Sequence, residues 1–241
     1  MPKISVTLAR REEIASATWA FRLGLGGAEY PYKAGQTIDL AFPAPLYTDA
    51  AGNMRTFSIA CAPGSGDLLV ATRTRGSAYK RSLLEAPLRT ALEADGPFGS
   101  FTLPNKPQPV VLLAGGIGVT PFRSMVEDAA RRKLAHSITL IHSSRTPEEA
   151  PFLEELARWA VDQPRFLYRP TMTQAERSGR TWTGDRRRVD ADYLAEILPG
   201  ERGGALYYAA GPQRFVAAAV EALKAIGVDE DQIRFEEFPG Y

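Results

Sequence analysis

Three stretches of this sequence combine residue types that could bind a phosphate or a flat ring. The first is the turn Gly115-Gly116-Ile117-Gly118-Val119-Thr120-Pro121, which follows the apolar run Val110–Ala114. Glycines let backbone amides approach a pyrophosphate, and the helix start that follows offers unpaired amides with partial positive charge. Glycine-rich strand–helix turns also occur for steric reasons, and Pro121 replaces the last glycine of the dinucleotide fingerprint. A nucleotide site and a tight turn both stay open from this motif alone.

The two other stretches are a second turn and a strand. Tyr207 to Gln213 repeats the pattern of a strand end, a glycine–proline pair and a helix. Two such turns at the carboxyl ends of parallel strands favour a ligand crevice there. Arg55-Thr56-Phe57-Ser58 offers an arginine for phosphate, an aromatic ring for stacking and a hydroxyl for a ring nitrogen. Taken alone, this last stretch is more simply a strand with a core phenylalanine.

The elements that would position these residues begin with short strands. One short helix is expected around Tyr79–Glu85, with Ser77 as its N-cap. Alternating or apolar runs predict strands at Lys3–Leu8, Thr18–Leu23, Gln36–Phe42, Arg55–Ala60, Leu68–Arg73, Leu88–Glu93 and Ser100–Leu103. Their number and spacing indicate a small antiparallel β-barrel over residues 1–104.

Three prolines within residues 104–109 mark a linker, because proline continues neither a helix nor a central strand. Strands are then expected at Val110–Ala114, Ile138–Ile141, Arg165–Arg169, Ala205–Ala209 and Ile233–Phe235. Helices are expected at Pro121–Lys133, Glu148–Val161, Ala191–Leu198 and Gln213–Ile226. The alternation predicts an α/β domain over residues 105–241, with a parallel sheet covered by helices on both faces. Thr120 is the predicted N-cap of the first helix and Pro121 its first residue.

Composition excludes several classes of protein. The 29 Lys and Arg residues balance 28 Asp and Glu, so a net charge of +1 gives no general attraction to nucleic acid or to a membrane surface. The single cysteine, Cys61, excludes an intrachain disulfide and a cysteine-held iron–sulfur cluster, and two histidines leave little for a metal site. No signal-peptide core or membrane-spanning run is present. We expect a soluble, cytoplasmic protein without a metal, in which Cys61 is a buried barrel residue and His142 a packed or surface residue.

In their order along the chain, the motifs resemble the ferredoxin–NADP⁺ reductase family, which includes oxygenase reductase components and NAD(P)H–flavin reductases. The motifs are Arg55-x-aromatic-Ser58, Gly96-Pro97-Phe98-Gly99, the turn Gly115–Pro121, Gly211-Pro212 and Glu236-x-Phe238. The resemblance covers essentially the whole chain. It implies a β-barrel that holds FAD, a second domain that binds NAD(P)H, and hydride transfer from NAD(P)H to FAD.

The resemblance also implies FAD contacts. Arg55 would pair with the pyrophosphate, Phe57 would stack on the isoalloxazine, and Ser58 would hydrogen-bond near flavin N5. The remaining FAD contacts would come from Thr56, Val70, Ala71, Thr72, Gly76, Ser77, Ala78, Tyr79 and Lys80. Phe57 departs from the tyrosine of many members, and Lys80 from a common serine or threonine.

On the nicotinamide side, the resemblance implies that Thr120 faces both the flavin and the nicotinamide rings. Phe238 or the terminal Tyr241 would cover the flavin face that the nicotinamide must reach, so Ser58, Thr120 and Phe238 are the catalytic candidates. The remaining nucleotide contacts would come from Gly115, Gly116, Ile117, Gly118, Pro121, Ser143, Ser144, Arg145, Gly211 and Pro212. Ala210 departs from the cysteine that often precedes Gly-Pro.

The implied partner is a separate redox protein, because this chain cannot hold a cluster of its own. A ferredoxin, a flavodoxin or an oxygenase component fits, and neither nucleic acid nor membrane insertion is expected. Arg145 and the arginines between Arg177 and Arg188 favour NADPH over NADH. Two alternatives stay open, a reductase of free flavin and a non-catalytic FAD-binding electron-transfer subunit. The electron-transfer subunits known in the family carry a cysteine cluster, which this chain lacks, and this argues against the second alternative.

Overall fold

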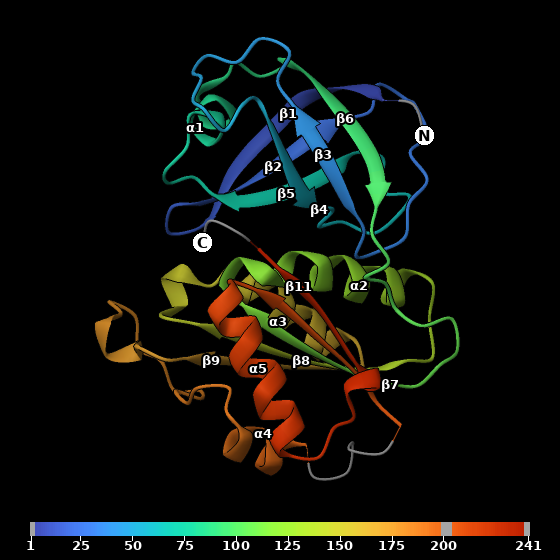
Figure 1. Cartoon of the computed structure of the whole chain (residues 1–241), viewed down its shortest axis with the longest axis vertical. Helices are drawn as coiled ribbons and strands as arrows, with labels where there is room; N and C mark the ends of the chain where they lie inside the picture. The colour runs from blue at the N-terminus through green and yellow to red at the C-terminus, as the bar shows by residue number, and fades with distance from the viewer. Residues whose placement is uncertain (1–2, 199–203, 239–241) are drawn as a thin grey trace.

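The computed structural model describes residues 3–198 and 204–238, and their strands form two sheets that lie one above the other (Figure 1). The upper sheet is antiparallel, with the order β4-β3-β6-β1-β2-β5. Its strands are β1 (Ile4–Ala15), β2 (Thr18–Gly24), β3 (Thr37–Ala41), β4 (Met54–Ser58), β5 (Leu68–Arg73) and β6 (Ala91–Phe98).

The upper sheet curls into a half-closed barrel. Just past the edge strand β4, the Ala60 amide donates to the carbonyl of Leu69 in the other edge strand, β5, at 2.7 Å. Ile38 and Leu40 alternate along β3 and are fully buried inside the curl, as a half-buried strand requires. The predicted antiparallel barrel is confirmed.

Three details of the barrel differ from the sequence prediction. β1 runs on to Ala15 because it pairs with β2 over most of its length. Ser100–Leu103 is not a strand, and the Thr102 amide instead bonds locally to the Ser100 carbonyl at 2.8 Å. The strand expected at Leu88–Glu93 begins only at Ala91, because Arg89 has the turn-forming φ of 70°.

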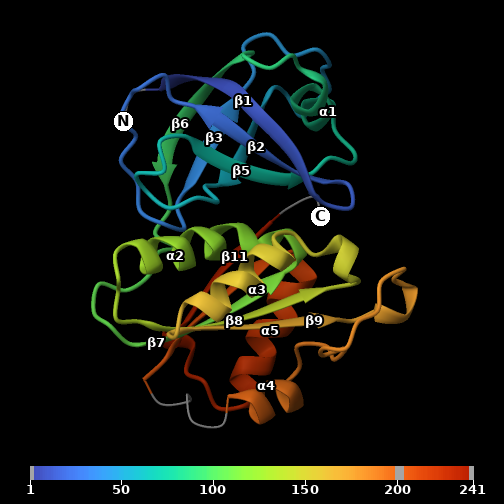
Figure 2. The same ribbon diagram turned by 180° about the vertical axis from the view of Figure 1, so that it is seen from behind.

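The lower sheet is parallel, with the order β11-β10-β7-β8-β9, and confirms the predicted α/β architecture. Its strands are β7 (Pro109–Gly115), β8 (Ser137–Ser144), β9 (Phe166–Met172), β10 (Leu206–Gly211) and β11 (Ile233–Glu237). Its helices are α2 (Val119–Arg131), α3 (Leu153–Asp162), α4 (Ala191–Ile197) and α5 (Gln213–Ala225). Figures 1 and 2 show α2 and α3 on one face and α4 and α5 on the other.

Helix starts follow local chemistry that the sequence shows only in part. α1 (Ala78–Glu85) is capped as predicted, because the Ser77 hydroxyl accepts from the Lys80 amide. The predicted N-cap Thr120 is wrong, since Gly118 caps α2. The expected helix from Glu148 is split, because Phe152 has a left-handed φ of 59° before α3. The short 3₁₀ turns are η1 (Gly116–Gly118), η2 (Pro147–Glu149), η3 (Ala175–Arg177) and η4 (Glu230–Gln232).

Helix α2 lies at the junction of the two lobes, directly beneath the barrel (Figure 1). Phe101, from the segment between the lobes, packs against Phe122 of α2 with ring centroids 5.8 Å apart and against Tyr208 of β10 at 5.2 Å. These contacts join the barrel core to one face of the lower sheet in a single apolar cluster. The two lobes therefore meet through packed side chains. None of the described helices has the length and apolarity to cross a membrane.

Candidate functional site

A cavity of about 840 Å³ lies where the barrel meets the lower lobe. The barrel contributes eight of the predicted site residues to its lining, namely Arg55, Thr56, Phe57, Ser58, Ala71, Gly76, Ser77 and Lys80. The lower lobe contributes Ile117, Thr120 and Phe238. Residues predicted from separate motifs therefore meet at one place, with catalytic candidates from both lobes.

Three predicted FAD contacts have buried side chains that do not line the cavity. Val70 and Thr72 are fully buried within the barrel, and Tyr79 is 1 % exposed. The Tyr79 hydroxyl donates to the Leu40 carbonyl at 2.8 Å, and its ring lies 6.0 Å from that of Phe57. Tyr79 thus backs the cavity wall without lining it, because the helical period places it on the buried face of α1 with Ser82 and Leu83.

The phosphate end of the cavity is held by a carboxylate. Asp49 accepts from the Ala78 amide at the start of α1 at 2.8 Å, and it lies 3.7 Å from the Arg55 guanidinium. Arg55 also donates to the carbonyls of Ala51, at 2.9 Å, and Gly52, at 3.1 Å. A carboxylate thus already binds the Ala78 amide and the Arg55 guanidinium, two groups that the sequence assigned to a pyrophosphate. These groups therefore form an anion site. The predicted FAD contact Ala78 donates its amide to Asp49, and the Ala78 side chain does not line the cavity.

Lys80 adds a cation whose charged form is destabilised by its surroundings. Burial, with the nearby charges of Arg55 and Arg73, lowers the pKa of Lys80 to about 8. Arg75 lines the same end of the cavity. Crowded cations that lose hydration are stabilised by a bound anion, so this end suits a phosphate-bearing ligand.

Ser58 presents the most specific polar signal in the cavity. Its hydroxyl is buried and has no hydrogen-bond partner among the described residues. An unpaired buried hydroxyl is costly, and a ligand atom that bonds to it removes that cost. The preceding residue of β4, Phe57, is buried and lines the same cavity. A flat, polar-edged ring system such as that of a flavin fits this wall.

In the two glycine turns, most glycines are required because a side chain would collide with neighbouring atoms. A side-chain carbon at Gly115 would lie 2.6 Å from the Phe215 ring, and one at Gly211 would lie 2.7 Å from the Gly115 carbonyl. Gly118 packs against the Ala210 carbonyl. Gly116 differs, with a φ of 52° and nothing within 4 Å of its missing side chain. Close packing thus explains most of these glycines, whereas Gly116 is favoured by its positive φ and has open space beside its α-carbon.

His142 is packed beneath the glycine turn, as one of the two expected settings for this residue. Its Nε2 lies 3.0 Å from the Gly116 carbonyl, which can only accept, so Nε2 carries the proton. Nδ1 accepts from the Tyr168 hydroxyl at 2.9 Å. Burial lowers the pKa of His142 to about 4, so the ring is neutral. His142 therefore fixes the turn from below, a role that the sequence did not predict.

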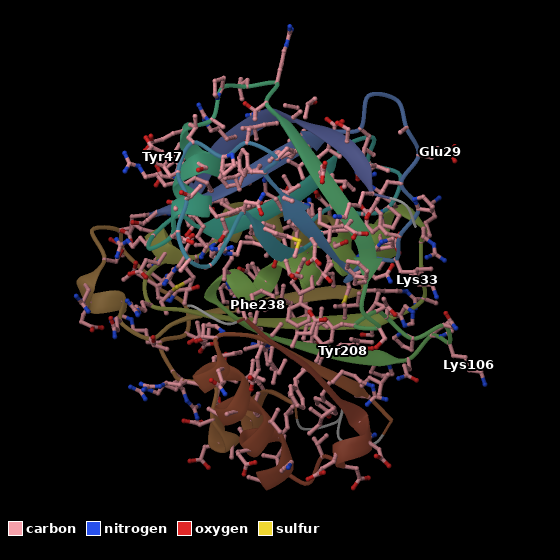
Figure 3. The ribbon with its side chains drawn as sticks, turned by 45° about the horizontal axis from the view of Figure 1, so that its top comes forward. Glu29, Lys33, Tyr47, Lys106, Tyr208 and Phe238 are labelled. Atoms are coloured by element: carbon pink, nitrogen blue, oxygen red, sulfur yellow. The ribbon has the colours of Figure 1, made fainter. Side chains whose placement is uncertain are left out.

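The lower wall of the cavity combines α2 with the C-terminal strand. The Thr120 hydroxyl donates to the Ile117 carbonyl at 3.0 Å, one turn back in the chain. Figure 3 shows Phe238 between the lobes, where its amide donates to the Gly211 carbonyl at 2.8 Å. Burial raises the pKa of Glu236, which also lines the cavity, to about 7. Tyr241, the other candidate flavin cover, lies outside the described residues.

The remaining nucleotide candidates lie at the carboxyl ends of the lower strands, away from the cavity lining. Ser143 and Ser144 end β8, and the Gln174 amide donates to the Arg145 carbonyl at 2.8 Å. Arg177 bonds to the Gln174 side chain at 2.9 Å. Gly115, Gly116, Gly118, Pro121, Gly211 and Pro212 form the two turns at the same edge of the sheet.

Six lining residues were not among the predicted site residues: Thr37, Ala51, Met54, Arg75, Glu236 and Glu237. Thr37 reaches the site because β3 pairs it with Ser58. Such register cannot be read from local sequence. Glu236 carried a signal, since it begins the Glu-x-aromatic motif. In the described part of the chain, no three His, Cys, Asp or Glu side chains gather closely enough to hold a metal ion.

Comparison with known proteins also indicates a nucleotide-binding oxidoreductase. Residues 112–221 match the family model described as the oxidoreductase NAD-binding domain. The chain is 31 % identical over 222 residues to ferredoxin–NADP reductase B of Sorangium cellulosum, covering 88 % of this chain and 87 % of that protein. It is 30 % identical over 228 residues to the flavohemoprotein of Bordetella pertussis, covering 88 % of this chain and 54 % of that longer protein.

Solved structures share the two-lobed fold. A cytochrome P450 reductase of Amycolatopsis superposes with a TM-score of 0.82 at 25 % identity, covering 98 % of this chain and 70 % of that one. The ferredoxin–NADP⁺ reductase of Neisseria gonorrhoeae, solved with bound FAD and NADP, gives 0.78 at 20 % identity, covering 98 % and 99 %. A relative this similar over nearly its whole length, together with the two-lobed fold, means that the chain belongs to the ferredoxin–NADP reductase family of NAD(P)H-dependent oxidoreductases.

Proposed function

We propose that the chain binds FAD in the cavity, receives a hydride from NAD(P)H on it and delivers the electrons to a separate redox protein. The observation that carries this proposal is the buried, unpartnered Ser58 hydroxyl in a wall that also presents Phe57, with a cationic end formed by Arg55 and Lys80. Bound FAD would supply the exchange between a two-electron donor and a one-electron acceptor. Residues 1–104 form the FAD-binding domain and residues 105–241 the NAD(P)-binding domain with the C-terminal tail.

The residues divide the binding work along the cavity. Arg55 and Lys80 hold the pyrophosphate, with Gly76 and Ser77 at the start of α1 beside them. Phe57 packs against the ring system, and the Ser58 hydroxyl bonds to its polar edge. Ala71 and Thr56 close the barrel side. The FAD-specific element of this proposal is the pyrophosphate site, which FMN would leave empty.

The lower lobe positions the nicotinamide. Gly116 leaves open space beside its α-carbon at the turn, and Thr120 lines the cavity from the lower lobe. Phe238 occupies the space between the lobes and excludes water until a nicotinamide displaces it. Ser58, Thr120 and Phe238 are thus the residues proposed at the reacting atoms.

The purified protein tests this proposal by its visible absorbance and its response to NADPH. Bound FAD that bleaches with NADPH is the expected result. Flavin that binds only as a turned-over substrate would support a free-flavin reductase, and bound FAD that NADPH leaves oxidised would support a non-catalytic subunit. Release of FMN on heating would contradict the pyrophosphate assignment.

We also propose that NADPH is preferred to NADH. Arg145 is largely exposed at the end of β8, and Arg177 lies close by through the shared Gln174. A 2′-phosphate between them would gain charge-assisted hydrogen bonds, each about 1.5–3 kcal/mol. Arg180 and Arg187 pair closely with Glu154 at 2.6 Å and Glu196 at 2.5 Å, whereas Arg145 lies 3.9 Å from Glu149. Measured kcat/KM should favour NADPH, and Arg145→Ala should reduce that preference; equal values for both nucleotides would contradict it.

A further inference from the structure

Three side chains on one face of α2 form hydrogen bonds with backbone groups of three consecutive barrel residues. Arg123 donates to the Ala60 carbonyl at 2.6 Å, and Ser124 donates to the Cys61 carbonyl at 2.5 Å. Glu127 accepts from the Ala62 amide at 2.9 Å. We call this set of contacts the α2 latch. It bonds the two lobes residue by residue, in a register that a slide of one residue would break.

The latch is buried and braced from behind. Arg123 is 7 % exposed, and its guanidinium makes two 2.7 Å hydrogen bonds to the Glu155 carboxylate. The same guanidinium lies 5.0 Å from the ring centroids of both Phe152 and Trp159. Charge-assisted hydrogen bonds away from water are short, directional and costly to break. The latch therefore restrains angle as well as distance.

Each half of the latch is close in sequence to a wall of the cavity. Ala60 follows Ser58 by two residues, and Arg123 follows Thr120 by three, which is one turn of α2. Ser58 and Thr120 line the cavity from opposite lobes. The latch is thus a polar link between segments that adjoin the two walls in sequence. The neighbouring aromatic contacts of Phe101 with Phe122 and Tyr208 hold the lobes together without fixing such a register.

We propose that the α2 latch sets the spacing between the Ser58 wall and the Thr120 wall, which makes Arg123, Ser124 and Glu127 positioning residues for hydride transfer. This inference rests on the proposed function. A displacement of about 1 Å in a reacting pair can lower a rate by about a hundredfold, so a register held by three hydrogen bonds matters to the reaction. Adhesion between the lobes would survive its loss.

Matched variants of Glu127 separate positioning from stability. Glu127→Ala removes the acceptor for the Ala62 amide, whereas Glu127→Gln keeps an acceptor oxygen there. We expect Glu127→Ala to lower the limiting rate of flavin reduction by NADPH about tenfold or more, with FAD affinity unchanged. Glu127→Gln should restore most of that rate, and Ser124→Ala should lower it in the same direction. Arg132→Ala is the control, because Arg132 caps the end of α2 and forms an ion pair with Asp128 of the same helix, at 3.2 Å.

A second measurement reports the register without turnover. Spin labels at Glu12→Cys on β1 and Leu167→Cys on β9 occupy exposed positions on the two lobes, while Cys61 is buried. We expect the distance distribution between the labels in FAD-loaded protein to broaden or shift in Glu127→Ala and to stay narrow in Glu127→Gln and Arg132→Ala. A lower melting temperature with an unchanged limiting rate and an unchanged distance distribution would overturn the inference. Absence of flavin reduction in the wild-type protein would instead overturn the proposed function.

Discussion

Arg55 is the residue through which the phosphate end of the cavity can be tested most simply. Its guanidinium is already held toward the start of α1 by Asp49 and by loop carbonyls. Arg55→Ala should weaken FAD binding by about 1.5–3 kcal/mol, the range for a hydrogen bond to a charged group. Fluorescence titration of the apoprotein with FAD measures this change. Arg81→Ala is the matched control, because Arg81 pairs with Glu85 on the exposed side of α1 at 2.9 Å. Equal FAD affinity in both variants would defeat the assignment.

Lys80 predicts how FAD affinity depends on pH. Burial and neighbouring cations lower the pKa of its ammonium to about 8 in the ligand-free protein. A bound pyrophosphate favours the protonated form, so FAD affinity should fall as the pH rises through about 8 and beyond. The same titration repeated between pH 7 and pH 9.5 measures it. Lys80→Met should bind FAD more weakly at pH 7 and lose most of this dependence, and an unaltered slope in that variant would show that another group titrates.

At the scale of elements, strand β11 and its Phe238 predict a gate. Phe238 packs partly buried against the core and is fixed to Gly211 through its amide. An aromatic ring stacked on another contributes about 0.5–1.5 kcal/mol, which a nicotinamide can displace. Phe238→Ser should therefore tighten binding of oxidised NADP⁺ by about two- to tenfold and alter the flavin spectrum. Difference spectra during NADP⁺ titration measure both changes. Unchanged spectra and affinity would remove Phe238 from the flavin face.

The elements themselves were largely predictable, because each depends on a local pattern. The alternation along β3, the apolar run of β7 and the Ser77 cap of α1 are visible in the sequence, and all three are present. Errors fell where backbone conformation or distant contacts decide. Phe152 adopts a left-handed φ that no local rule assigns to phenylalanine, and this breaks the expected helix.

Site residues that belong to sequence motifs were predictable, whereas those brought to the cavity by strand pairing were not. Arg55, Ser58 and Thr120 meet in the cavity as their motifs imply. Thr37 and Arg75 carry no motif, and they reach the cavity only through strand pairing and the turn before α1. His142 could not have been placed, because its role depends on Gly116 and Tyr168, which are brought to it by folding.

At the scale of the whole molecule, Glu236 links stability to pH. Burial raises the pKa of its carboxyl from 4.5 to about 7. The folded protein therefore holds this proton between pH 4.5 and pH 7 while the unfolded chain has lost it, so the free energy of unfolding falls as pH rises through this window. Glu236→Gln should stabilise the apoprotein by about 1–3 kcal/mol at pH 8 and have little effect near pH 4. Denaturant melts at both pH values check this, and an equal effect at both would show that the carboxyl does not titrate there.

The central claim concerns the two lobes acting as one enzyme, with FAD on the barrel and NAD(P)H on the parallel sheet. Its most direct test is anaerobic titration of the FAD-loaded protein with NADPH, followed by the visible flavin absorbance. We expect about one equivalent of NADPH to bleach the flavin and a one-electron acceptor to restore its absorbance. Tightly bound FAD that stays oxidised under excess NADPH and excess NADH would contradict it.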